Sequence, residues 1–298
     1  MSRTVSPKLE LSESKYSPVP AMGTGVQGSA MRKHETPRVA PPERNTVGRQ
    51  SDLAARVGVL LYGVASYALC LGVFAYAAGW ISGIGGLTPT ALDYKPGVGD
   101  GPRSVAIAID AALLVVFAVQ HSVMARPWFK RAWTRIVPAA AERSTYVLFS
   151  SIAMIAMFWL WRPIGGVIWD VQNPAGRTAI FGAYGAGWAL LLLATFLINH
   201  FDLFGLRQVW LRFRGREYAP LPFKTPALYR VVRHPLYVGW LTLFWAAPTM
   251  TAAHLLFAAG STVYILMAIR WEERDLVAAH PEYAQYRRRV GMLLPRGG

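Results

Sequence analysis

The chain has 298 residues, of which 53% are hydrophobic and only 16% are charged, and its formal net charge is +15. The charged residues are gathered into a few segments between long apolar blocks, a pattern that excludes a water-soluble globular protein. Runs of about 18 or more mostly apolar residues are candidates for membrane-spanning helices. The composition therefore predicts an all-α, polytopic integral membrane protein in the lipid bilayer.

Residues 1–52 precede the first apolar block. They hold six prolines and many serines and threonines, with mixed charges and no apolar periodicity. Such a composition cannot offset the entropy of ordering the chain, and it lacks the apolar core of a secretory signal peptide. We expect a disordered cytoplasmic tail, with a partner-binding segment as the alternative. Nothing in the sequence implies an obligate protein partner.

Five apolar blocks follow the tail. The first four, which we place in a four-helix core at 53–224, are 57–94, 104–125, 144–161 and 178–201. The fifth, 235–269, lies in a separate C-terminal module at 225–298 and is long enough for an out-and-back helical hairpin. We expect its turn at Pro248–Thr251. Because the first arm of this hairpin is short, the sequence predicts five to six transmembrane helices.

The distribution of charge predicts the topology. The segments 126–143 and 202–233 are rich in arginine. By contrast, the segments 81–103 and 162–177 carry few or balanced charges. By the positive-inside rule, both basic segments and both termini face the cytoplasm, which in a bacterium places the protein in the inner membrane. A nucleic-acid partner is not expected, because the basic residues flank membrane spans, where they attract anionic lipid headgroups.

Two histidines lie near the predicted cytoplasmic ends of apolar blocks. His121 is either a proton acceptor or a polar bridge between helices. His200 is close enough in sequence to Asp202 for the carboxylate to orient the imidazole and raise its basicity, although the pair could instead cap a helix end. The single cysteine, Cys70, excludes a disulfide framework, and no cluster of residues has the spacing of metal ligands.

The fifth block is flanked by an unusual constellation of polar residues. It opens with Arg-His-Pro-Leu-Tyr-Val-Gly at 233–239, where Pro235 suits the first turn of a helix. The free N–H groups of that turn favour a carboxylate, and Gly239 permits close approach of a ligand or another backbone. At the other end, Glu273 shares a helical stripe with Arg270, and Glu272 points about 100° away. Either carboxylate could meet an amine, a sugar hydroxyl or a sulfonium, and the spacing alone allows many ligands.

These residues resemble a known family. The Arg-His-Pro-x-Tyr-x-Gly turn, the Glu272-Glu273 pair and Tyr283-x-x-Tyr286 are similar to the isoprenylcysteine carboxyl methyltransferase superfamily over about residues 225–295, and also to the phospholipid N-methyltransferases. Upstream, four segments resemble its NnrU-related branch, which includes the bacterial methanethiol S-methyltransferases: 120–127, 142–146, 161–164 and 199–208.

The resemblance implies a binding site for S-adenosylmethionine that opens to the cytoplasm. Its expected cofactor-binding residues are Arg233, His234, Pro235, Tyr237, Gly239, Arg270, Glu272, Glu273, Tyr283 and Tyr286. Among these, Glu273 would meet the amine or ribose of the cofactor, and Tyr283 and Tyr286 would close over its adenine.

The implied reaction is transfer of a methyl group to methanethiol, giving dimethyl sulfide and S-adenosylhomocysteine without a metal. The small volatile thiol must lose a proton, and the candidate bases are His200 with Asp202, then His121, then Tyr237. The thiol could enter from the lipid beside the small residues at 182–187, although those glycines could equally serve helix packing alone. Alternatives are a methyltransferase for a prenylcysteine carboxylate or a lipid amine, and a non-enzymatic membrane protein of the NnrU type.

Overall fold

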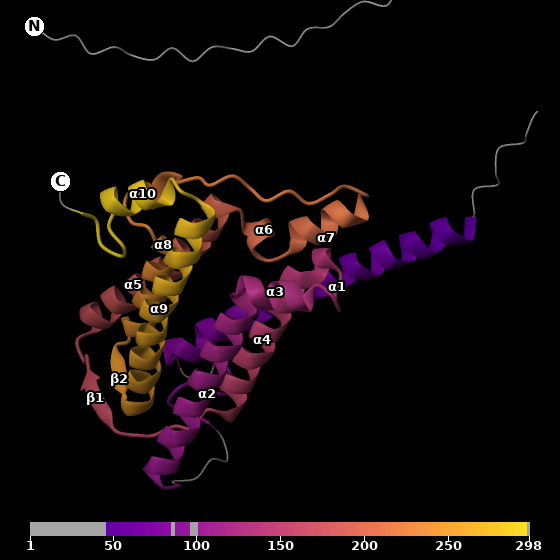
Figure 1. The fold of residues 1–298 in the computed structure, drawn as a ribbon. Coiled ribbons are helices and arrows are strands. Elements are labelled where there is room, and N and C mark those ends of the chain that lie inside the picture. Colours follow the sequence, from indigo (N-terminus) through magenta and orange to yellow (C-terminus); the bar gives the residue numbers. More distant parts are fainter. Residues whose placement is uncertain (1–45, 85–86, 96–100, 297–298) are drawn as a thin grey trace, which may run out of the picture. The chain divides into compact units, whose positions relative to one another are not determined.

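The computed structural model describes residues 46–84, 87–95 and 101–296. Most of the expected disordered tail, residues 1–45, lies outside these ranges. The described chain is mostly helical (Figure 1). The long helices are α1 (Thr46–Ser82), α2 (Arg103–Ala125), α4 (Glu142–Leu160), α5 (Pro174–Ile198) and α9 (Ala252–Ala279). The shorter elements are the helices α3 (Pro127–Trp133), α6 (His200–Leu203), α7 (Leu206–Phe213), α8 (Pro235–Trp245) and α10 (Tyr283–Arg289), 3₁₀ turns at Ala139–Ala141 and Ala227–Arg230, and the strands β1 (Val167–Asp170) and β2 (Thr249–Thr251).

Five of the described helices are long and apolar enough to cross a membrane, namely α1, α2, α4 with its preceding turn, α5 and α9. Their outward faces carry exposed apolar side chains such as Val115, Leu193 and Val263, which suit contact with lipid. The protein is therefore a polytopic integral membrane protein, as its apolar blocks predict.

The sixth passage through the bundle is made differently. Helix α8 has only 11 residues, roughly 16 Å, which is too short for a hydrocarbon core of about 30 Å. The chain continues in an extended form to β2, which pairs antiparallel with β1 beside the start of α5. Non-helical backbone is tolerated at membrane depth only where protein surrounds it and its polar groups are paired. Pro248 O accepts from Val171 N, and Met250 is fully buried.

This arrangement shows how the predicted hairpin crosses the bundle, which the sequence alone did not decide. The chain turns between α8 and α9 where the Pro248–Thr251 segment predicts it, and the structure has five full-length helices plus a partial sixth. The pairing of this turn with β1 was not predicted. Since the passages of the chain are even in number, the start of α1 and helix α10 belong to the same end of the bundle.

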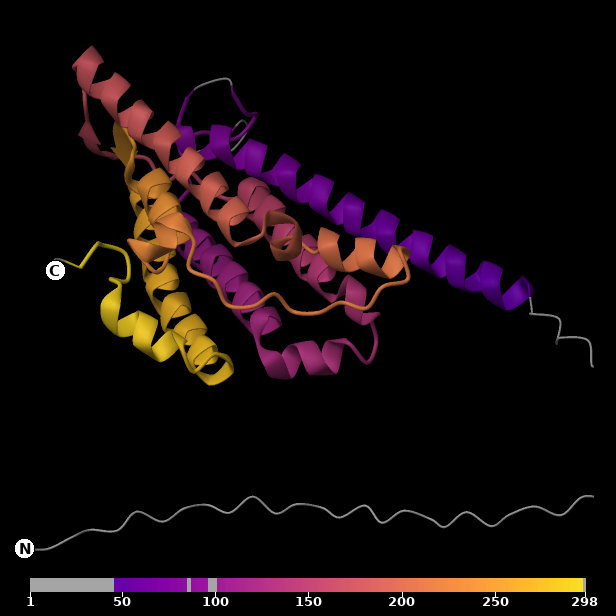
Figure 2. The same cartoon turned by 90° about the horizontal axis from the view of Figure 1, so that it is seen from above.

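Helices α5 and α8 pack through glycine. A Cβ atom added to Gly239 would lie 3.0 Å from both Gly187 O and Leu191 N, so the two backbones approach as closely as they can. The sequence left Gly239 open between a ligand and a backbone neighbour, and the structure gives it the backbone of α5. Gly187 likewise serves helix packing. Seen from above (Figure 2), the extended segment 216–226 runs from α7 toward α8 across this end of the bundle.

Candidate functional site

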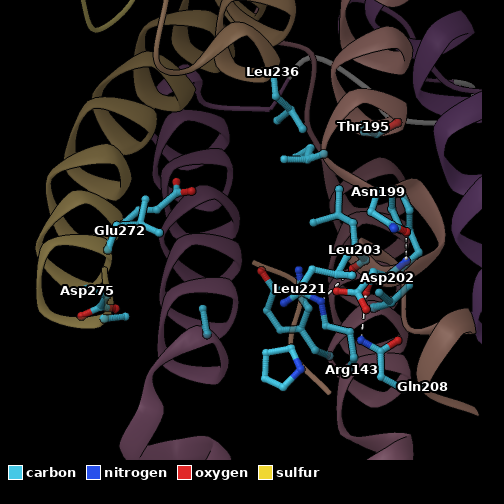
Figure 3. Close-up of a pocket in the computed structure, with 18 of the residues that line it drawn as sticks. Arg143, Thr195, Asn199, Asp202, Leu203, Gln208, Leu221, Leu236, Glu272 and Asp275 are labelled. Carbon is cyan, nitrogen blue, oxygen red and sulfur yellow. Dashed lines mark hydrogen bonds between the residues drawn. The ribbon is translucent and has the colours of Figure 1, made fainter. Parts of the chain in front are cut away.

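A cavity of about 1490 Å³ opens at the end of the bundle where α6, α7 and the start of α8 lie. Figure 3 shows Glu272 and Asp275 of α9 on one side of it, and Asn199, Asp202 and Leu203 opposite. Pockets for small ligands commonly measure about 300–1,000 Å³. The cavity is therefore large enough for a sizeable ligand together with a small second one.

Glu273 is the internal member of the Glu-Glu pair. Its Oε1 accepts hydrogen bonds from Arg233 Nε at 2.6 Å and from Tyr283 OH at 3.3 Å, and lies 3.1 Å from His234 Nε2. The Arg233 and Glu273 side chains are 9% and 10% exposed, and Glu273 does not line the cavity. Glu273 therefore ties α9 to α10 and to the residues before α8, a different position from the ligand contact expected of it.

A C-terminal strap, residues 290–292, crosses the start of α8. Gly291 O accepts from Arg233 N at 2.8 Å, Met292 O accepts from His234 N at 3.2 Å, and Arg233 Nη1 donates to Val290 O. This strap pairs the N–H groups of the two residues just before α8, beside the turn that was expected to face a ligand.

Pro235 is the first residue of α8, as predicted, and has no N–H. Val238 N donates to His234 O. Within the described chain, the N–H groups of Leu236 and Tyr237 have no partner, and both residues line the cavity. Together with the helix dipole, these two groups form a binding point for an anion.

Glu272 is the carboxylate that faces the cavity (Figure 3). The hydroxyl of Tyr237 donates to Glu272 Oε2 at 3.0 Å, which orients the carboxylate beside the anion-binding turn. The geometry thus distinguishes two carboxylates that were both expected to bind the ligand. Glu272 can meet a cationic ligand, and Glu273 supports the surrounding chain.

An aromatic cluster lines the mouth of the cavity. Phe223 makes edge contacts with Tyr283 and Tyr286, with ring centroids 5.6 and 5.7 Å apart, and stacks on His280 at 5.6 Å. Burial raises the pKa of Tyr286 to about 12, so its hydroxyl stays neutral. Tyr283 and Tyr286 were predicted here, and Phe223 was not. Its only signal was an apolar Leu-Pro-Phe within a basic segment.

His121 also lines the cavity. Its Nε2 lies 2.6 Å from Tyr146 OH and its Nδ1 lies 3.0 Å from Ser150 Oγ. The guanidinium of Arg143 lies 4.9 Å from the centroid of the Tyr146 ring. The sequence predicted His121 as a candidate residue but did not predict Tyr146. The three-residue spacing of Arg143 and Tyr146 places them on one helix face, and this spacing could have indicated their contact.

His200 lies apart from the cavity. Its Nε2 is 2.7 Å from Tyr67 OH, its Nδ1 is 2.8 Å from Thr195 Oγ1, and its side chain is buried. Burial lowers the pKa of this imidazole. Asp202 does line the cavity, but its carboxylate accepts from Arg207 at 2.8 Å and from Tyr218 at 3.3 Å. The expected pairing of Asp202 with His200 is therefore wrong.

Three other expected binding residues, Pro235, Gly239 and Arg270, do not line the cavity, whereas Arg233 and His234 do. Arg270 is exposed and does not line it, because its position on α9 turns it outward. Gly239 faces α5, as described above. Among the described residues, no group of three His, Cys, Asp or Glu side chains could hold a metal ion.

Comparison with known proteins assigns the family. A methanethiol S-methyltransferase of Crocosphaera subtropica is 54% identical over 242 residues, which cover 81% of this chain and 93% of the relative. The chain belongs to the methanethiol S-methyltransferase family. Another methanethiol S-methyltransferase, from Mycobacterium tuberculosis, is 51% identical over 237 residues, covering 79% of this chain and 95% of that protein.

A more distant relative lies outside the methanethiol S-methyltransferases. Nurim of Mus musculus is 32% identical over 179 residues, covering 57% of this chain and 68% of Nurim. No family model matches the chain, and no solved structure matches it.

Proposed function

We propose that the protein transfers a methyl group from S-adenosylmethionine to methanethiol, giving dimethyl sulfide and S-adenosylhomocysteine. Relatives named methanethiol S-methyltransferase are similar to this protein over most of its chain. The cofactor assignment rests on one observation, that three kinds of binding group lie around the same cavity. Glu272, the unpaired N–H groups of Leu236 and Tyr237, and the Phe223 cluster all face one cavity.

These groups match the chemistry of the cofactor. The N–H groups at the start of α8 suit its carboxylate, Glu272 suits its amine, and the rings of Phe223, Tyr283 and Tyr286 offer a surface for adenine. When bound, the cofactor supplies an electrophilic methyl group. Arg233 and His234 also line the cavity, and Glu273 and the strap hold them in place beside the binding turn.

We assign the role of base to His121. A thiol with a pKa near that of cysteine, about 8.5, is mostly protonated at neutral pH, so its attack is faster beside a proton acceptor. His121 lies on the cavity wall, and the Tyr146 and Ser150 hydroxyls hold its ring. His200 is set apart from His121 because the ring of His200 does not line the cavity. Tyr237 serves instead to orient Glu272.

We further propose that the cavity opens to the cytoplasm and that both termini lie there, in the inner membrane of a bacterium. The end of the bundle that carries the cavity is rich in basic residues. Those lining the cavity include Arg126, Lys130, Arg143, Arg212, Arg216 and Lys224. The positive-inside rule directs this end to the cytoplasm. A small thiol reaches the protein without need of a protein partner.

The test is headspace gas chromatography over membranes of an expressing strain, supplied with methanethiol and S-adenosylmethionine. Dimethyl sulfide should appear only when the protein and the cofactor are both present, and not over membranes of the empty-vector strain. Purified protein should bind S-adenosylmethionine in a calorimeter. Cofactor binding without dimethyl sulfide would redirect the search to prenylcysteine and lipid-amine acceptors. Absence of both would refute the methyltransferase assignment.

A further inference from the structure

The deep end of the cavity is closed by three aromatic rings, Phe74, Trp188 and Trp240, which we call the aromatic wall. Each ring contacts the other two. The centroids are 5.7 Å apart for Phe74 and Trp240, 5.8 Å for Trp188 and Trp240, and 6.4 Å for Phe74 and Trp188. Phe74 and Trp240 face the cavity, and Trp188 lies behind them. Edge-to-face contacts of this kind hold rings in fixed relative positions.

The aromatic wall is supported from behind. Trp240 follows Gly239, whose contact with Gly187 brings α5 against α8. Trp240 also stacks on Phe244, with ring centroids 5.6 Å apart. Behind the rings lie fully packed core residues such as Val73 and Leu243. A close-packed interior does not yield to an added methylene without strain, so the wall is a fixed boundary.

The deep end differs chemically from the mouth. Phe74, Val147, Leu191 and Trp240 give it an apolar lining without a charged side chain, and His121 reaches the same cavity from α2. The N–H groups assigned to the cofactor, on Leu236 and Tyr237, lie about one helical turn before Trp240, and the carboxylate assigned to it, Glu272, comes from α9 and bonds Tyr237. An apolar acceptor therefore fits between the cofactor groups and the aromatic wall.

We propose that the aromatic wall sets the length of the acceptor, admitting methanethiol and excluding longer alkyl thiols. The inference rests on the proposed function and deepens it by naming what limits the substrate. Trp240 and Phe74 are the residues that determine specificity, because their rings occupy the space that a longer alkyl chain would enter.

The experiment compares kcat/KM for methanethiol and butanethiol in the wild-type protein and in the variants Trp240→Ala and Phe74→Ala. The wild type should strongly prefer methanethiol. Each variant should raise the butanethiol-to-methanethiol ratio by roughly tenfold or more, since one methylene in an apolar pocket changes selectivity by about 10- to 200-fold. Trp245→Ala is the matched control. Trp245 lies on the same helix, is 41% exposed and does not line the cavity, and its side chain donates to Thr262, so its removal should leave the ratio unchanged.

Each outcome bears on the wall separately from the proposed function. A wild type that methylates both thiols equally well overturns the aromatic wall as a length limit, as does an unchanged ratio in folded variants that retain activity on methanethiol. If Trp240→Ala fails to elute as a single species in detergent, Phe74→Ala and Trp240→Leu decide the matter. A wild type that methylates no thiol, despite binding the cofactor, instead refutes the proposed function.

Discussion

At the scale of single residues, the two adjacent glutamates of α9 have separate tasks. Neighbouring positions on a helix point about 100° apart, so one carboxylate can face the cavity while the other faces the protein. Glu272 takes the first position and Glu273 the second. A pair of acidic residues that looks like one feature in sequence is therefore two features in the fold.

Exchanging each glutamate for glutamine should separate these tasks. Glu272→Gln should raise the KM for S-adenosylmethionine at least about tenfold with little change in Tm, because it removes the charge that meets the amine. Glu273→Gln should lower Tm by several degrees, because Arg233 loses its charged partner in a mostly buried position. Kinetics and thermal unfolding in detergent measure both. Equal effects of the two substitutions on KM and Tm would contradict the division.

The base should show itself in the pH profile. His121→Gln should lower kcat at pH 7 by about 10²-fold or more, the usual scale for a general base. The deficit should shrink as pH rises past about 8.5, where a thiol ionises unaided. In His200→Gln, any loss should be independent of pH, because His200 does not reach the cavity. A constant deficit in His121→Gln would make His121 a structural bridge.

His200 should instead control stability in acid. The pKa of a histidine in an unfolded chain is about 6.5. Burial lowers the pKa of His200 below this value in the folded protein. The unfolded chain therefore binds more protons as pH falls below 6.5, and stability that is complete above this pH is lost toward the folded-state pKa. The Tm of the wild type should fall between pH 7 and 5. His200→Gln, which cannot titrate, should lose less Tm over that range, and parallel slopes would count against the assignment.

At the scale of elements, the sequence predicted the long helices well and the short elements poorly. Blocks of membrane-spanning length with few or no charged residues are a strong signal, and they correspond to α1, α2, α4, α5 and α9. The strands β1 and β2 have four and three residues, too few for an alternating pattern to be recognised. They exist because the extended end of the hairpin pairs with the loop before α5, a contact between distant segments.

The α5–α8 contact should be sensitive to a single methyl group. Gly239→Ala places its Cβ 3.0 Å from two backbone atoms of α5, which cannot move independently. Overpacking of this kind costs about 1–3 kcal/mol, so Tm should fall. Gly185→Ala is the control on α5, because a Cβ there meets nothing within 4 Å. Equal Tm values for Gly239→Ala and Gly185→Ala would argue against close packing of α5 and α8 at Gly239.

At the scale of the whole molecule, the candidate site is assembled from distant parts of the chain. Tyr237, Glu272 and Tyr283, which the sequence predicted as binding residues, all line the cavity. Their motifs are local and lie close to a predicted hairpin. The sequence could not place Phe223, which reaches the mouth only because 216–226 crosses the end of the bundle. It also paired His200 with Asp202, because proximity in sequence does not reveal which way each side chain turns.

The path of the chain can be tested by labelling. In a Cys70→Ser background, which removes the only cysteine, the exposed positions 172 and 288 can each carry a new cysteine. Gln172→Cys should react with a membrane-impermeant maleimide in intact cells, and Arg288→Cys only after permeabilisation, because six passages return the chain to the basic side. Arg131→Cys should behave like Arg288→Cys. Labelling of positions 131 and 288 from opposite sides would disprove the even number of passages.

The strap also has a consequence for biosynthesis. The carbonyls of Gly291 and Met292 accept hydrogen bonds from the N–H groups of Arg233 and His234. The start of α8 therefore cannot complete these bonds until residues more than fifty positions later have been synthesised. All the apolar blocks precede the strap and can enter the bilayer before it is translated. During synthesis, insertion is therefore separable from maturation, and a nascent chain arrested before residue 290 would be embedded in the membrane but unable to complete its catalytic pocket.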